Sequence, residues 1–83
     1  MSKELQLEII TPEKILFNNA IKEVEVPGQK GRLAILRDHA PIISVLVKGN
    51  IRVVDTAGSE QNFDCIAGYI ECAENKVTIL LNS

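Results

Sequence analysis

The stretch Leu33–Val47, LAILRDHAPIISVLV, holds two apolar runs joined by a polar turn at Arg37–His39. Its second run, Ile42–Val47, is too short for a stable helix and is rich in β-branched residues, so it predicts a strand buried on both faces or nearly so. Pro41 fits only at the start of such a strand, because proline cannot donate to a sheet ladder. The chain's single histidine, His39, lies in the turn, which makes this turn the first place to look for function.

Period-two alternation extends outward from this stretch in both directions. Leu5–Ile9 alternates strictly, and in Lys76–Leu81 three aliphatic residues share one face, so both segments predict half-buried strands. Further strands are expected at 14–17, 20–26, 51–55, 61–67 and 69–73. Asn18–Asn19 and Glu74–Asn75 are predicted as turns, because asparagine tolerates positive φ.

Two glycine-containing segments interrupt these strands. Pro27–Arg32 predicts an exposed loop with two glycines and two cations. Gly68 either makes a hairpin turn or lets the chain bend from one sheet to the other, and glycine suits both. About nine to ten short strands, with turn signals every eight to ten residues or so, indicate an all-β fold. We therefore expect one domain, residues 1–83, built as a small sandwich of two mainly antiparallel sheets.

Composition and charge exclude several function classes. The chain has 83 residues, 46% hydrophobic, with a net charge of −2. The acidic balance disfavours nucleic-acid binding, which needs a basic stripe. No apolar run reaches the ~18–20 residues of a membrane span, and no signal-peptide pattern opens the chain, so a cytosolic start is expected. Cys65 and Cys72 are then predicted to be reduced, buried thiols, and they could pair only if a tight turn at Gly68–Tyr69 placed them opposite each other.

Reactive chemistry is not indicated. One histidine is too few for a multi-histidine metal site, and Ser44 and Ser59 have no evident base partner. We therefore expect no catalytic residue, no metal and no cofactor. A carbohydrate- or peptide-binding sandwich usually displays exposed aromatics as binding platforms, and only Tyr69 is available for that role. A lipoyl or biotin carrier would need a modified lysine at a hairpin tip, and Lys48 and Lys76 lack the usual flanking residues.

A set of motifs covers nearly the whole chain in order. They are Leu7–Pro12, Gly28 with Gly31, Leu33–Ile43 with its Asp-His-Ala-Pro, Gly49–Val53, Gly68–Glu71 and Asn75–Leu80. Together they resemble the ε subunit of rotary F-type ATP synthases, and the His-Ala-Pro after a glycine-rich loop is the distinctive part. The resemblance implies a β-sandwich that is not an enzyme and that holds no cofactor.

The resemblance also implies a role and two partners. Such a domain sits at the foot of the central stalk, peripheral to the membrane on the cytoplasmic side of the bacterial inner membrane. It links the γ subunit to the c-ring and so couples proton flow to ATP synthesis. Residues matching the family's γ-facing positions are Thr11, His39, Pro41, Ile42 and Ser44. Lys30, Gly31 and Arg32 match the ring-facing tip.

The chain departs from the family pattern in two ways. Many relatives carry an acidic residue where Arg32 stands, which suggests that the ring loops facing it carry compensating acids. Most relatives also continue into a pair of helices used in inhibition and ATP sensing. These 83 residues contain no counterpart of that helical hairpin, so the resemblance does not extend those functions to them.

Overall fold

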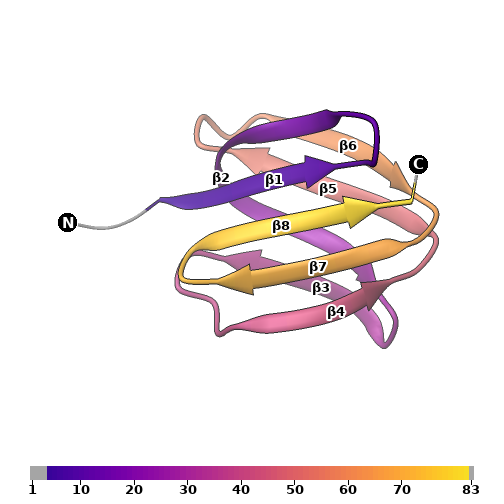
Figure 1. The fold of residues 1–83 in the computed structure, drawn as a ribbon. Coiled ribbons are helices and arrows are strands. Elements are labelled where there is room, and N and C mark those ends of the chain that lie inside the picture. Colours follow the sequence, from indigo (N-terminus) through magenta and orange to yellow (C-terminus); the bar gives the residue numbers. More distant parts are fainter. Residues whose placement is uncertain (1–3, 83) are drawn as a thin grey trace.

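The computed structural model describes residues 4–82, which form eight strands (Figure 1). In chain order these are β1 (Leu5–Ile10), β2 (Ile15–Gly28), β3 (Gly31–Leu36), β4 (Ile42–Leu46), β5 (Gly49–Asp55), β6 (Glu60–Cys65), β7 (Gly68–Ala73) and β8 (Lys76–Leu81). The predicted all-β class is confirmed. Within residues 4–82 no helix is long and apolar enough to cross a bilayer.

The strands form two layers that face each other. One layer has the order β1-β8-β7-β4, and the other has β3 and β5 on either side of β2, with β6 beyond β5 (Figure 1). All pairings are antiparallel except that of β1 with β8. The long strand β2 connects the layers, because its first half pairs with β1 and its second half pairs with β3 and β5.

The core between the layers is almost wholly aliphatic. Its fully buried side chains come from the inward positions of both layers: Leu5, Leu7, Ile9, Val24, Val26, Ile35, Leu46, Ile51, Val53, Ile70, Val77 and Ile79. Phe17 and Phe63 close its margin with an edge-to-face contact, 6.1 Å between ring centroids. Removing this apolar surface from water, at about 25 cal/mol per Å², is the main force that holds the two sheets together.

The predicted turn at Asn18–Asn19 is wrong. These residues continue β2 and pair with Glu8 and Leu7 of β1, so two predicted short strands become one. The ladder to β1 outweighs the local turn preference of asparagine. A second irregularity follows between Ile21 and Glu23, where the register of β2 against β5 shifts. Such a bulge adds a residue to one strand, which keeps Ile21 on the buried side with the valines that follow it.

The expectation that Ile42–Val47 is buried on both faces is also wrong. In β4 the side chain of Leu46 is buried, whereas Ile43 is 74% exposed and Val45 is 43% exposed. The strand thus has one inner and one outer face, like its neighbours in the layer. Pro41 directly precedes β4, as predicted.

The two glycine-containing segments, at Gly68 and at Pro27–Arg32, both connect strands. Gly68 lets the chain pass from one layer to the other, since β6 and β7 do not pair, and Cys65 and Cys72 are both free and buried. A Cβ at position 68 would clash with the backbone carbonyl oxygen of Leu80, so only glycine fits there. The predicted loop at Pro27–Arg32 is shorter than expected, because β2 and β3 extend into it and are joined by a two-residue turn at 29–30.

Candidate functional site

An apolar row crosses the outer face of the β1-β8-β7-β4 layer. The register places four outward side chains next to one another, one per strand: Ile10, Leu80, Tyr69 and Val45. Tyr69 is 55% exposed and Leu80 is 48% exposed, and Ile43 lies two residues from Val45 on the same face. A contiguous group of exposed aliphatic and aromatic side chains marks an interaction surface. We call this outer face the apolar face.

The outer face of the second layer carries paired charges instead. Arg52 on β5 donates to Glu60 on β6 at 2.7 Å and lies 4.0 Å from Glu23 on β2. The hydrogen bond and charge of Glu60 raise the pKa of Arg52 above its usual value. Asn50 and Asn62 are joined across the same two strands at 2.9 Å. We call this outer face the charged face; its ion pairs are solvent-exposed, so each contributes little to the stability of the fold.

The turn that carries His39 is tied to the turn between β7 and β8. The backbone N–H of Asp38 donates to the Oδ1 of Asn75 at 2.6 Å, and the Nδ2 of Asn75 donates to the Asp38 carboxylate at 3.0 Å. Both residues have positive φ, 65° and 62°. We call this reciprocal contact the Asp38–Asn75 clasp. It fixes the position of the His-Ala-Pro segment against the start of β8.

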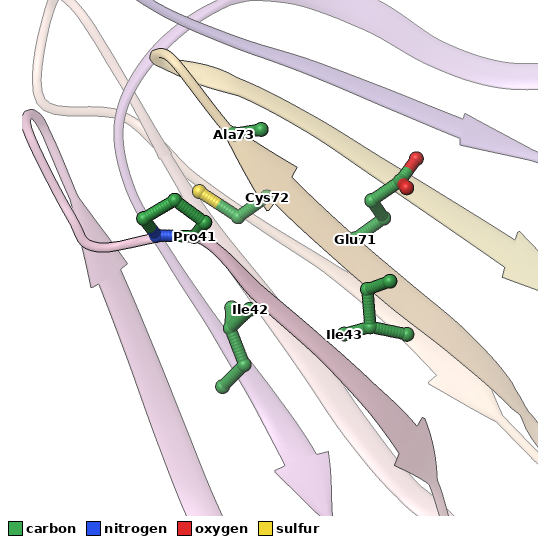
Figure 2. Close-up of a pocket in the computed structure, with 6 residues that line it drawn as sticks. All are labelled: Pro41, Ile42, Ile43, Glu71, Cys72 and Ala73. Carbon is green, nitrogen blue, oxygen red and sulfur yellow. The ribbon is translucent and has the colours of Figure 1, made fainter.

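A shallow depression lies beside this turn, lined by Pro41, Ile42, Ile43, Glu71, Cys72 and Ala73 (Figure 2). Its volume is about 350 Å³, and its walls come from paired segments of β4 and β7. In the register Ile43 lies opposite Glu71 on the outer side and Ile42 lies opposite Cys72 on the inner side, so the depression is lined from both sides of this strand pair. It is a surface feature and not an enclosed pocket for a small molecule.

The five residues matching γ-facing positions do not form one cluster. His39 and Pro41 lie at the end of the sandwich where β4 and β8 begin, and the His39 ring nitrogen Nδ1 lies 2.7 Å from the carbonyl oxygen of Ala40. Ile42 and Ser44 lie on the inner side of β4 and are half-buried. Thr11 lies at the opposite end, where its hydroxyl accepts from the N–H of Lys14 and stabilises the β1–β2 turn.

The three residues matching ring-facing positions lie together at the tip of the β2–β3 hairpin. Gly31 has a φ of 124°, which favours glycine. Arg32 folds back onto its own sheet, donating to the Glu25 carboxylate at 3.0 Å and to the Asn50 carbonyl at 2.7 Å. Lys30 is exposed and takes part in no ion pair within residues 4–82. Lys30 is therefore the more available charge at this tip.

Sequence reasoning missed the outward residues of the apolar face as a site. Tyr69 alternates with buried Ile70 and Cys72, and this alternation is a signal that could have placed it outside. Between Ile43 and Val45 lies Ser44, and alternation would normally put this polar residue on the outer side and its apolar neighbours inside. The structure has the opposite arrangement, so alternation in β4 would have predicted the wrong face.

The described residues offer little reactive chemistry. No three of their His, Cys, Asp or Glu side chains are grouped so that they could hold a metal ion. Burial raises the pKa of the Cys65 and Cys72 thiols, so both stay protonated and unreactive near neutral pH. The arrangement is suited to contact with other macromolecules.

Comparison with known families gives a consistent result. The family described as "ATP synthase, Delta/Epsilon chain, beta-sandwich domain" matches residues 4–83. The chain is 37% identical over 79 residues to the ATP synthase epsilon chain of Natranaerobius thermophilus, covering 94% of this chain and 56% of the relative. It is 35% identical over 78 residues to that of Chlorobaculum tepidum, covering 94% and 89%. It is 43% identical over 83 residues to that of Campylobacter hominis, covering 95% and 62%. The chain thus spans little more than half the length of some of these relatives and most of the length of another.

Solved structures with the same fold also come from ATP synthases. A chain of the Euglena gracilis mitochondrial ATP synthase superimposes with a TM-score of 0.91 at 13% identity, covering 96% of this chain and 51% of that chain. A chain from the central stalk and c-ring of the Tetrahymena thermophila enzyme superimposes with a TM-score of 0.81 at 16% identity, covering 99% and 66%. At such identities the likeness establishes the fold.

Proposed function

Because this chain belongs to the ATP synthase delta/epsilon chain β-sandwich family, we propose that it is a non-catalytic subunit of the central stalk of a proton-translocating F-type ATP synthase. In this role it links the γ subunit to the c-ring and so couples proton flow to ATP synthesis. It would act on the cytoplasmic side of a bacterial inner membrane, peripheral to the bilayer. The observation that carries the proposal is the apolar face, on which Tyr69, Leu80 and Val45 lie in register and are exposed.

The γ subunit is proposed to cover the apolar face. Burying Tyr69 and its neighbours in a partner would remove apolar surface from water, and tyrosine is among the residues that dominate interface energies. His39 and Pro41 lie at the end of the sandwich where β4 begins, next to the Asp38–Asn75 clasp, and we propose that they meet γ at the margin of this contact. Contacts of Thr11, Ile42 and Ser44 with γ stay predictions. Because Ile42 and Ser44 lie on the inner side of β4, γ could reach them only from the open edge of that strand.

The c-ring is proposed to meet the tip of the β2–β3 hairpin. Lys30 and Gly31 lie at this tip, and the backbone there is set by the tight turn. Because Arg32 is held by Glu25, acids on the ring loops would act chiefly on Lys30. Holding two partners at once also raises affinity, since the second contact becomes intramolecular.

The test uses matched substitutions on the two outer faces. Leu80 on the apolar face and Leu36 on the outer side of β3 are exposed to similar degrees, 48% and 52%. Leu80→Gln should weaken binding to purified γ subunit by about tenfold or more, because it buries an amide in an apolar contact. Leu36→Gln should leave binding within about twofold.

The bait for the wider test is the chain itself, incubated with rotor complexes from native membranes. Co-purification of γ and c subunits with the wild-type chain supports the proposal. Failure of the wild-type chain to retain γ, or equal losses for both leucine variants, would contradict it.

A further inference from the structure

One edge of β4 is left without a partner strand over most of its length. β4 pairs with β7 along all five of its residues, but it pairs with β2 at the single position Gly28–Leu46. At this end the carbonyl of Val45 accepts from the N–H of Gln29 at 3.2 Å, and the N–H of Val47 donates to the carbonyl of Pro27 at 2.9 Å. These bonds show which backbone groups of β4 point away from β7.

The alternation of an antiparallel ladder extends this assignment along the strand. Neighbouring residues point their N–H and C=O groups to opposite edges, so the groups of Ile43 share the edge of Val45, whereas those of Ser44 face β7. The N–H and C=O of Ile43 and the N–H of Val45 therefore lie on the open edge. No described strand pairs with β4 there. An open row of this kind is a template for another strand.

A groove runs along this edge. It has a volume of about 480 Å³ and lies between β4 and the tip of the β2–β3 hairpin, with Gly28–Leu33 on one side and Ile42–Val45 on the other. Two cations, Lys30 and Arg32, line it, and no carboxylate does. Arg32 is already paired with Glu25, so Lys30 is the charge that an incoming segment would meet.

We infer that the open edge of β4 accepts an extended, acidic segment of the γ subunit as an added strand. Its backbone would pair with Ile43 and Val45, its alternate apolar side chains would extend the apolar row, and a carboxylate would reach Lys30. This recognition mode takes affinity from main-chain hydrogen bonds and specificity from alternate side chains. The inference rests on the proposed function for the identity of the partner, and it adds the way in which the partner is held.

Amide hydrogen exchange tests the pairing directly, with an internal control in the same strand. In the isolated chain the amides of Ile43 and Val45 should exchange quickly, while that of Ser44, which faces β7, should be protected. On binding γ, the exchange of Ile43 and Val45 should slow by about a hundredfold, because their N–H groups become paired. Ser44 should change little.

A substitution at Ile43 removes the edge donor, and a second one controls for the smaller side chain. Ile43→Pro deletes an N–H that makes no bond to β7, and proline is tolerated on an open strand edge. It should weaken γ binding by about tenfold, whereas Ile43→Val, which keeps the N–H, should stay within about threefold. Urea unfolding of both variants checks that each is folded.

The outcomes separate the two proposals. Unchanged exchange at Ile43 and Val45 in a complex that does form would overturn the added strand and leave the rotor role intact. Protection that rises with concentration of the isolated chain would also overturn it, because it would mean that two copies pair at this edge. A wild-type chain that binds no γ would overturn the proposed function together with this inference.

Discussion

On the apolar face, Leu80, Tyr69 and Val45 lie in register across three strands and stay exposed to solvent. On the charged face, at the corresponding outward positions, Arg52 is bonded to Glu60 and lies near Glu23. Both faces come from the same period-two alternation, so strand geometry does not explain the difference. The charged outward residues of the charged face pair with one another, and Leu36 is its exposed apolar exception. Those of the apolar face make no such pairs among residues 4–82, which is why this face is the one that we propose a partner covers.

The largest expected effect concerns the close approach of β7 and β8, which brings Tyr69 beside Leu80. Gly68→Ala places a Cβ against the backbone carbonyl oxygen of Leu80, well inside van der Waals contact, and 3.2 Å from Leu81 Cδ2, so backbone must move. We expect a loss of about 2–5 kcal/mol in the free energy of unfolding, measured by urea titration.

Gly58→Ala is the matched control for this substitution. Position 58 has a φ of 90° but no atom within 4 Å of an added Cβ, so only backbone strain applies, about 1–2 kcal/mol. Equal losses for Gly68→Ala and Gly58→Ala would show that the approach of β7 to β8 is not what builds the apolar face.

A smaller effect is expected from the Asp38–Asn75 clasp, which ties the turn joining the two layers to the end of β7. Asn75→Gly keeps positive φ accessible but removes the amide, and should cost about 1 kcal/mol. Asn75→Asp removes the Nδ2 donor and sets two carboxylates against each other, so it should cost more.

Exchanging the two residues provides the rescue. In the double variant Asp38→Asn/Asn75→Asp, the amide introduced at position 38 can donate to the carboxylate introduced at position 75, which still accepts from the backbone N–H at position 38. We expect this double variant to recover most of the stability lost in Asn75→Asp, as measured by a double-mutant cycle. No recovery would indicate that the contact in the structure contributes nothing.

Much of the fold follows from the sequence because burial and alternation act locally. Val77, Ile79 and Leu81 are buried as their spacing predicts, and Glu74–Asn75 is a turn with both residues at positive φ. Asn18–Asn19 fails as a turn because its partner strand β1 lies elsewhere in the chain. The turn preference of asparagine is a local property, whereas the pairing of β2 with β1 depends on the fold. A single sequence does not reveal which of the two prevails.

The candidate site was harder to predict for a different reason. A run such as Ile42–Val47 looks the same whether its second face meets the core or a partner protein. On the proposed function a partner covers Ile43 and Val45, and the sequence of this chain alone does not contain that information. The resemblance to a known family predicts contacts at the His39 turn and the Lys30 tip, which stay predictions, and it did not single out Tyr69 or Leu80.

The thiols report on the core that both faces share. Cys65 lies in β6, in the layer that carries the charged face, and Cys72 lies in β7, in the layer that carries the apolar face. Burial raises the pKa of each thiol. A thiol that stays protonated in the folded state while it ionises in the unfolded state favours unfolding at high pH. Stability should thus be insensitive to these thiols below about pH 8.5 and should fall as pH rises above that value.

Serine replacement isolates this contribution. The slope of unfolding free energy against pH in the alkaline range should be smaller for Cys65→Ser/Cys72→Ser than for the wild-type chain. Alkylation by iodoacetamide at neutral pH should be slow in the folded chain and fast in urea. Rapid alkylation of one cysteine alone would mean that one layer opens independently of the other.

The smallest effects are expected on the charged face, and they decide how the ring-facing tip should be tested. Arg32→Glu sets a carboxylate against Glu25, so it should lower the stability of the chain itself, by up to about 1 kcal/mol. In about 0.5 M salt this loss should shrink, because exposed charges are screened.

A weaker rotor assembly in the Arg32→Glu variant would therefore combine this internal repulsion with any change in the electrostatic match to the ring. Among residues 4–82 Lys30 is in no ion pair, so Lys30→Glu should leave stability within about 0.5 kcal/mol. Because Lys30 is also proposed to meet the γ segment, the readout is binding to the isolated c-ring. If the ring loops carry compensating acids, Lys30→Glu weakens that binding more than Arg32→Glu does, and the reverse order would return that role to Arg32.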